Sequence, residues 1–381
     1  MPSCSGARGN TRSSSTCRRK GIASLSATIS KRYLLDLTPE VVMSGPGPSR
    51  LIIPLVVLSL AACSSPTEFS GDAPVPCTLP NATCAERVQI GDGVFLPVFR
   101  THPLGDGDDS VTRGLIVVHG ANRNADNYFR SGLLAASAAG EQSRTIVIAP
   151  YFQTSEDGPA PDELYWSSGG WKRGHLSSSS GPAPRVSSYA AIDHIVSLLA
   201  DRGRFPAIRQ IVVTGHSAGG QVVHRYAASS RAEESSPGVT LRYVVANPST
   251  YLYTRPERAS GPGFDPPDAA ACPDFDDWHY GLEERNSYAS TSTADTVRAR
   301  LARRDVRILI GDADSLSSSL DVTCGANLQG PYRFARGQTL MRFMDAFFTG
   351  HRHVEMVVPG VGHSNRQMWL SSVGIQSLFG S

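Results

Sequence analysis

Six short apolar runs, separated by longer segments, constrain the fold of this chain most. The runs cover residues 115–118, 145–149, 210–214, 241–246, 306–310 and 353–358. Intervening segments such as 188–202 repeat apolar residues at helical spacing, which is typical of helices with one buried face. Apolar strands that alternate with helices are buried on both faces of their sheet. The sequence therefore predicts an α/β fold, with a mostly parallel central sheet and helices on both faces, over residues 87–381.

The segments beside these runs predict the remaining elements. Residues 87–90 and 95–101 alternate around Gly91-Asp92-Gly93 and indicate an opening hairpin. Helices are expected over 124–139, 188–202, 297–303 and 336–349, and a last helix from near Ser364. Two long irregular stretches, 151–186 and 254–290, carry the large aromatic residues Trp166, Trp171, Trp278 and Tyr280. Loops of this length are usually functional, so some of these aromatics are candidates for a pocket wall, although the core is the simpler position for each.

Composition narrows the class of protein. The 381 residues are 40% hydrophobic and 18% charged, which is ordinary for a chain with a folded core. The formal net charge is +2, so the charge balance gives no reason to expect a nucleic-acid partner. No motif implies a cofactor, and no group of cysteine and histidine has zinc spacing, so no metal is expected.

The N-terminal 86 residues differ in composition from the rest. Residues 1–42 are rich in Ser, Arg and Gly and predict a disordered or wrongly assigned leader, with Met43 as the true start. Residues 43–62 combine a basic flank, an apolar run over 51–60 and small residues, as a secretory signal does. The alternative for that run is a short buried or interfacial segment.

Leu60-Ala61-Ala62-Cys63 resembles the bacterial lipoprotein box, which implies lipidation of Cys63 and anchoring in the cell envelope, or secretion. Residues 63–86 predict a Pro/Ser/Thr-rich tether.

Cysteine usage agrees with export. Four cysteines follow Cys63, namely Cys77, Cys84, Cys272 and Cys324. An even number in an exported chain predicts two disulfides, and proximity favours Cys77–Cys84 with Cys272–Cys324 among three possible connectivities. A cytosolic location would leave these thiols free.

One strand runs into Gly215-His216-Ser217-Ala218-Gly219, and apolar residues at helical intervals follow it. A strand, a sharp turn and a helix are the context of a nucleophile elbow, which lifts a serine hydroxyl clear of a sheet. The pentapeptide alone is weak support, since the chain holds 36 glycines, and a plain Gly-rich turn is the alternative. Asp314 and His363 also follow predicted strands. Because the carboxyl ends of parallel strands meet at one edge, all three side chains are expected there.

Residues 87–381 resemble serine α/β-hydrolases. The resemblance rests on His119-Gly120, the elbow at 215–219, Gly311-x-x-Asp314 and Gly360-x-Gly362-His363. It implies that Ser217 is the nucleophile, that His363 is its general base and that Asp314 orients the histidine. It also implies an oxyanion hole from the backbone N–H groups of Ala121 and Ala218. Asp312 and Asp321 remain alternatives for the acid, and His216 is expected to support the turn.

Two further motifs narrow the resemblance to particular groups of hydrolases. Ser-Ser-Tyr189-x-x-Ile-Asp193 and Asn247-Pro248-Ser249 are similar to secreted bacterial esterases and polyhydroxybutyrate-depolymerase-like hydrolases. The implied function is exported hydrolysis of a small or oligomeric carboxylic ester, with membrane contact only through the lipid anchor. A serine peptidase or amidase on the same fold and a non-catalytic binding protein are the alternatives. The oligomeric state stays open, and His351 and His353 are expected in a solvated turn.

Overall fold

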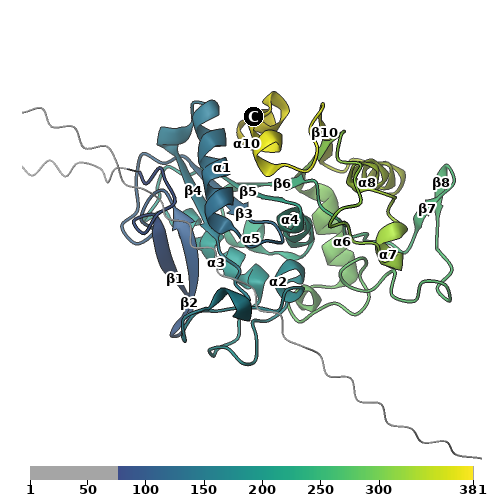
Figure 1. Cartoon of the computed structure of the whole chain (residues 1–381), viewed down its shortest axis with the longest axis horizontal. Coiled ribbons are helices and arrows are strands. Elements are labelled where there is room, and N and C mark those ends of the chain that lie inside the picture. Colours follow the sequence, from purple (N-terminus) through teal and green to yellow (C-terminus); the bar gives the residue numbers. More distant parts are fainter. Residues whose placement is uncertain (1–75, 381) are drawn as a thin grey trace, which may run out of the picture. The chain divides into compact units, whose positions relative to one another are not determined.

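The computed structural model describes residues 76–380. Their centre is an eight-stranded sheet with the order β1-β2-β4-β3-β5-β6-β9-β10 (Figure 1). Its strands are β1 (Ala85–Gly91), β2 (Val94–Arg100), β3 (Arg113–Val118), β4 (Thr145–Pro150), β5 (Gln210–His216), β6 (Thr240–Ala246), β9 (Asp305–Gly311) and β10 (His353–Val358). Strand β2 is antiparallel to β1 and β4, and all other neighbours are parallel. The predicted mostly parallel α/β fold is confirmed.

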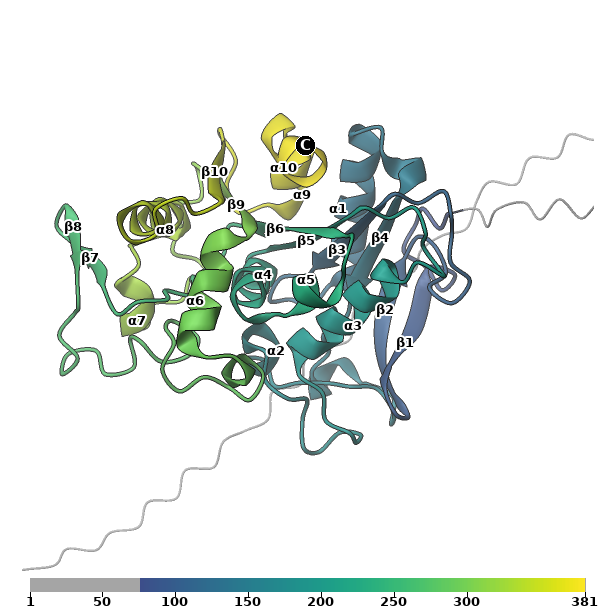
Figure 2. The ribbon, with the colours of Figure 1, turned by 180° about the vertical axis from the view of Figure 1, so that it is seen from behind.

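Helices cover both faces of the sheet and bury a separate apolar core on each (Figures 1 and 2). One face packs against α1 (Ala125–Ala138), α9 (Asn365–Leu370) and α10 (Ser372–Phe379). The other packs against α3 (Ser188–Ala200), α4 (Ala218–Ser229), α6 (Ala294–Arg303) and α8 (Arg333–Phe347). Alternate residues of one strand serve opposite cores, as Leu115 and Ile116 of β3 do. Burial on both faces explains why these strands are continuous apolar runs.

The predicted helices occur with small changes at their ends. Helix α8 begins at Arg333, three residues before the predicted start, and the last helix is divided into α9 and α10 at Ser371. Ser371 ends α9 in an extended conformation, and its hydroxyl accepts the Gly374 N–H at 2.9 Å as the N-cap of α10. No helix within residues 76–380 is long and apolar enough to cross a membrane.

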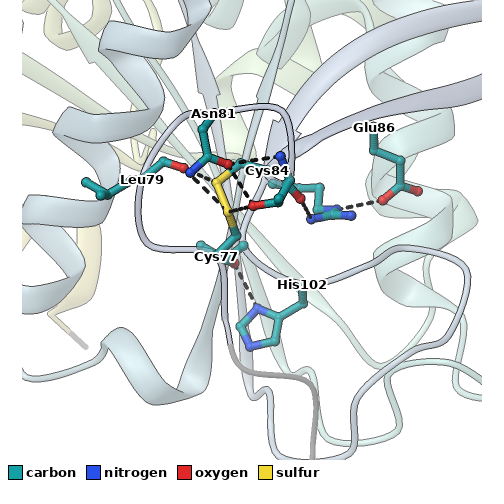
Figure 3. Close-up of a disulfide and its surroundings, with 9 residues drawn as sticks. Cys77, Leu79, Asn81, Cys84, Glu86 and His102 are labelled. Carbon is teal, nitrogen blue, oxygen red and sulfur yellow. Dashed lines mark hydrogen bonds and ion pairs between the residues drawn. A yellow bond between two sulfur atoms is a disulfide. The ribbon is translucent and has the colours of Figure 1, made fainter.

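The segment before β1 is part of the folded domain. Cys77 and Cys84 form a disulfide with a Cα–Cα distance of 5.4 Å (Figure 3). The Cys77 N–H donates to the Thr101 carbonyl at 2.8 Å, and Cys84 is fully buried. Composition assigns residues 76–86 to the tether, but they belong to the folded domain. The disulfide and these contacts hold residues 76–84 against the hairpin, and Ala85 and Glu86 are the first residues of β1. The leader, the signal segment and Cys63 lie outside the described residues.

The two long stretches lie over the sheet as loops with short elements. Residues 151–187 contain the 3₁₀ turn Ser155–Asp157 and α2 (Gly170–Arg173), and Trp166 and Trp171 are each 1% exposed. The second stretch contains the small hairpin β7 (Arg258–Ser260) and β8 (Gly263–Asp265). The remaining short elements are α5 (Ala232–Ser235), α7 (Cys324–Asn327) and 3₁₀ turns at Gln142–Arg144 and Ala289–Thr291.

The second disulfide joins the second stretch to the segment before α8. Cys272 and Cys324 are bonded with a Cα–Cα distance of 5.8 Å, which completes the pairing that proximity favours. The Trp278 indole N–H donates to the Arg173 carbonyl at 2.8 Å, so the stretch also contacts α2. The second stretch is thus tied to both neighbouring loops and does not form a separate domain.

The expectation for His353 is wrong. This residue is 6% exposed, because it opens β10 and pairs with Val306 of β9. Its ring packs beside those of His351 and His224, at centroid distances of 5.5 and 6.4 Å. Pairing with β9 takes His353 into the core, which the local sequence does not reveal.

Candidate active site

Ser217 occupies the sharp turn between β5 and α4. Its backbone has φ 59° and ψ −118°, a conformation that an L residue adopts only where its surroundings impose it. The turn passes so close to β3 that a Cβ on Gly219 would lie 2.2 Å from the Val118 carbonyl oxygen. The Ser217 N–H donates to the Ala246 carbonyl of β6 at 2.9 Å, which ties the turn to the neighbouring strand. The close approach of the two backbones therefore explains why residue 219 is a glycine. The turn has the geometry of a nucleophile elbow.

A pocket of about 250 Å³ opens beside Ser217. It is lined by Gly120, Ala121, Asn122, Asn124, Asn127, Tyr128, His216, Ser217, Ser319, His363 and Asn365. Four carboxamides and no long aliphatic side chain belong to this wall. The Ser217 side chain does not cap α4, so its hydroxyl is free of that contact and borders the pocket together with His363.

His363 and Asp314 form a hydrogen-bonded pair. The distance from His363 Nδ1 to Asp314 Oδ2 is 2.7 Å. The carboxyl group is 1% exposed, whereas the imidazole is 30% exposed and reaches the pocket. A buried carboxylate on Nδ1 leaves Nε2 as the nitrogen available to accept a proton. The structure thus brings Asp314, His363 and Ser217 to one edge of the sheet.

The two alternative acids have other partners. Asp312 Oδ1 accepts the Gly360 N–H at 2.7 Å and so supports the turn that carries His363. Asp321 Oδ2 accepts the Tyr280 hydroxyl at 2.7 Å. Of the three candidate acids, only Asp314 contacts the histidine.

Asn247 links the acid strand to the histidine turn. Its Oδ1 accepts the Gly311 N–H at 2.9 Å, and its Nδ2 donates to the Gly362 carbonyl at 3.2 Å. Its backbone has φ 40°, a left-handed value that asparagine tolerates better than most residues. In the sequence, Asn247 is apparent only as part of Asn247-Pro248-Ser249. Its position directly after β6, at the carboxyl edge, is the signal that could have indicated this role.

The turn after β3 orients one predicted oxyanion donor. The Phe152 N–H donates to His119 Nε2 at 3.0 Å, so the ring proton lies on Nδ1, 3.0 Å from the Gly120 carbonyl oxygen. That carbonyl and the Ala121 N–H belong to one trans peptide and point in opposite directions, so His119 fixes the direction of the N–H. Burial lowers the pKa of His119 to about 4, which keeps the ring neutral. Ala218 begins α4, where a helix leaves its first N–H groups without helical partners.

His216 packs between the pocket and α1. Its Nδ1 lies 3.2 Å from the Tyr128 hydroxyl, and its ring centroid lies 4.4 Å from that of His363. Burial, with His363 and Arg333 nearby, holds the pKa of His216 well below its usual value. A neutral, buried ring is consistent with a supporting role.

The four loop aromatics do not line the pocket beside Ser217. Trp171 packs against His119 with a centroid distance of 4.8 Å, so it supports the ring of the histidine that follows β3. Trp166 borders a separate pocket of about 560 Å³, and Trp278 and Tyr280 border another of about 360 Å³. The pocket-wall interpretation therefore applies to three of them, but away from Ser217.

Arg333 contacts the site, and nothing in the sequence indicates that contact. Its guanidinium is 1% exposed and lies 3.5 Å from Asp314 Oδ1. It is one of many arginines in the chain, and its contact depends on how α8 packs against the loop after β9.

Comparisons with known proteins agree with this fold. A model described as the alpha/beta hydrolase family matches residues 115–370. Poly(aspartic acid) hydrolase-1 from Sphingomonas sp. KT-1 is 24% identical, with a TM-score of 0.53 over 74% of this chain and 94% of that chain. The poly(3-hydroxybutyrate) depolymerase LpqC from Bordetella parapertussis is 22% identical, with a TM-score of 0.52 over 74% and 86%. These identities speak for the fold alone, and no curated protein sequence matches the chain. The family model spans more than half of the sequence, and the chain therefore belongs to the alpha/beta hydrolase family.

Proposed function

We propose that this hydrolase is an exported serine esterase that cleaves carboxylic esters through an acyl-enzyme on Ser217. The observation that carries the proposal is the 2.7 Å bond between His363 and the buried Asp314, in the pocket that Ser217 borders. A serine hydroxyl is too weakly acidic to attack an ester unaided, so a neutral imidazole must accept its proton. His363 lines this pocket with an imidazole that is 30% exposed, so it is suited to that task.

The reaction proceeds in two steps. In the first, Ser217 Oγ bonds to the ester carbonyl carbon while His363 takes the hydroxyl proton, and the Ala121 and Ala218 N–H groups bind the oxyanion. The carbon–oxygen bond of the ester then breaks, and His363 returns the proton to the departing alcohol. In the second step water attacks the acyl-enzyme with the same assistance, which releases the acid and restores the serine.

The pocket favours a short or polar substrate. Its volume of about 250 Å³ is below the range of roughly 300–1,000 Å³ typical of drug-sized ligand sites. Asn122, Asn124 and Asn127 offer hydrogen bonds rather than an apolar channel for a long acyl chain. We expect p-nitrophenyl acetate to be cleaved with a kcat/KM at least tenfold above that of the octanoate, and equal values would contradict this assignment.

Ester hydrolysis by matched serine variants tests the proposed function. Wild-type protein is expected to cleave p-nitrophenyl acetate, S217A to lose nearly all activity, and S319A, which removes the other serine of the pocket, to keep it. A folded wild-type protein inert to esters would favour a binding protein. Faster hydrolysis of the matching p-nitroanilide than of the ester would favour an amidase.

Export and anchoring are part of the proposal. Leu60-Ala61-Ala62-Cys63 supports lipidation of Cys63, and two disulfides are more common in oxidising compartments than in the cytosol. Mass spectrometry of the mature protein is expected to find a lipid-modified N-terminal Cys63. An intact peptide that spans Ala62 and Cys63 would contradict the lipoprotein assignment.

A further inference from the structure

The buried arginine behind Asp314 is absent from the mechanism above, although it contacts the proposed acid. Arg333 is the first residue of α8, and its side chain and that of Asp314 are each 1% exposed. Asp314 uses Oδ2 for His363 and Oδ1 for Arg333, at 2.7 and 3.5 Å. One carboxylate thus lies between an imidazole and a permanent cation.

The same guanidinium holds the segment that follows the acid. Nη2 donates to the carbonyls of Ser319 at 2.7 Å and Ser318 at 3.2 Å, and Nη1 donates to that of Leu316 at 3.5 Å. Ser319 has φ 52°, a left-handed value unfavourable for serine, and it lines the pocket beside Ser217. The backbone is joined too, since the Phe334 N–H of α8 donates to the Asp314 carbonyl at 3.3 Å. Arg333 therefore connects the acid to one wall of the substrate pocket.

Charge is the second consequence of this position. A buried carboxylate is costly unless it is paired and hydrogen-bonded. Arg333 and His363 are the two side chains that bond to Asp314, through Oδ1 and Oδ2. Arg333 therefore compensates the buried charge of Asp314 and restrains the carboxylate to which His363 is bonded.

We propose that Arg333 is a positioning residue for ester hydrolysis, which fixes Asp314 together with the segment 316–319 that carries the pocket residue Ser319. The inference rests on the proposed function of Ser217, Asp314 and His363. It assigns Arg333 no contact with the substrate. Its effect passes through the carboxylate, the histidine and the backbone of residues 316–319, not through the Ser319 hydroxyl.

Steady-state hydrolysis of p-nitrophenyl acetate by wild type, R333M and R333K tests the positioning role. R333M loses the bonds to Asp314 and to three carbonyls, so its kcat is expected to fall about 100-fold, with a smaller change in KM. R333K keeps a charge beside Asp314 but cannot reproduce the fork of contacts, so it is expected to rescue part of the loss, with a kcat about tenfold below wild type.

Arg336 supplies the matched control. It is also fully buried on α8, and it donates to the carbonyls of Ser249 and Gly330 at 2.6 and 2.8 Å, with no bond to Asp314. R336M is expected to lower the melting temperature and to keep kcat within about threefold of wild type. Wild-type kcat and KM in folded R333M would overturn the positioning role. If R333M does not fold, R333K decides alone, because wild-type kcat and KM in that variant would overturn the positioning role. A wild-type protein without esterase activity would instead reject the proposed function itself.

Discussion

At the scale of single residues, the groups at and beside the pocket are oriented by contacts with residues that do not line it. Asp314 is bonded by Arg333, His119 by the Phe152 N–H, and the histidine turn by Asn247. Such outer contacts leave each functional group one conformation, which reduces the reorganisation that the reaction requires. The motifs predicted Ala121, Ser217 and His363, which line this pocket. The contacts behind them depend on elements far apart in sequence and could not be predicted.

The two aspartates after β9 are separable by amide substitution. D314N is expected to lower kcat by about 10³–10⁴, because an amide cannot stabilise the imidazolium that forms on His363. D312N is the control, since its Oδ1 can still accept the Gly360 N–H, and its kcat is expected to stay within about tenfold of wild type. Steady-state kinetics of both folded variants measure this. Equal losses would contradict the assignment of Asp314.

The turn after β3 provides a second residue-scale prediction. H119A removes the contact that fixes the Gly120–Ala121 peptide, so kcat is expected to fall about 10–100-fold while KM changes little. Circular dichroism checks the fold, and burst kinetics separate acylation from later steps. Wild-type kcat in a folded H119A would show that the Ala121 N–H does not need this support.

At the scale of elements, the local sequence pattern predicted the strands of the sheet better than the helices and segments that pack on it. Strands β3, β5 and β9 are continuous apolar runs, so their existence and type follow from burial on both faces. Helix α8 starts earlier than its apolar spacing indicates, because Arg333 is anchored by the loop after β9. Composition assigns residues 76–86 to the tether, because it does not reveal the Cys77–Cys84 disulfide or the pairing of Ala85 and Glu86 with β2. Tertiary contacts decide both cases.

The Cys272–Cys324 disulfide allows a prediction about the loop that carries Asp314. It joins the second long stretch to α7, which follows that loop, so C272S/C324S is expected to lower kcat/KM about 3–10-fold at temperatures where the protein stays folded. C77S/C84S removes the disulfide beside β1 and β2 and is expected to lower the melting temperature with wild-type kcat/KM. Loss of activity only on unfolding in both variants would contradict this distinction.

At the scale of the whole molecule, the order of the strands and the burial of the histidines cannot be predicted from the local sequence pattern. Neighbours such as β6 and β9 are separated by more than fifty residues in sequence, and only their packing reveals the pairing. His119, His216, His224 and His353 are all buried, and burial lowers the pKa of each. Their location predicts a property of the entire fold, its sensitivity to acid.

The free energy of unfolding is expected to fall as pH decreases from 6.5. Burial lowers the pKa of His353 from 6.5 to about 3, so the unfolded chain binds a proton in this range that the folded protein does not. The stability present above pH 6.5 is lost as pH falls toward 3, by a few kcal/mol at about 1.4 kcal/mol per unit. Urea titrations of wild type and H353L at pH 7 and pH 5 measure it. H353L is expected to show the smaller decline, and equal declines would contradict a neutral buried His353.

Covalent labelling tests most directly whether Ser217 is the nucleophile. Wild-type protein is treated with a fluorophosphonate, digested and mapped by mass spectrometry, with S217A and S319A in parallel. One phosphonyl adduct on Ser217 is predicted in wild type and S319A, and none in S217A. Folded wild-type protein without an adduct, or with its adduct on Ser319, would contradict the assignment of Ser217 as the nucleophile.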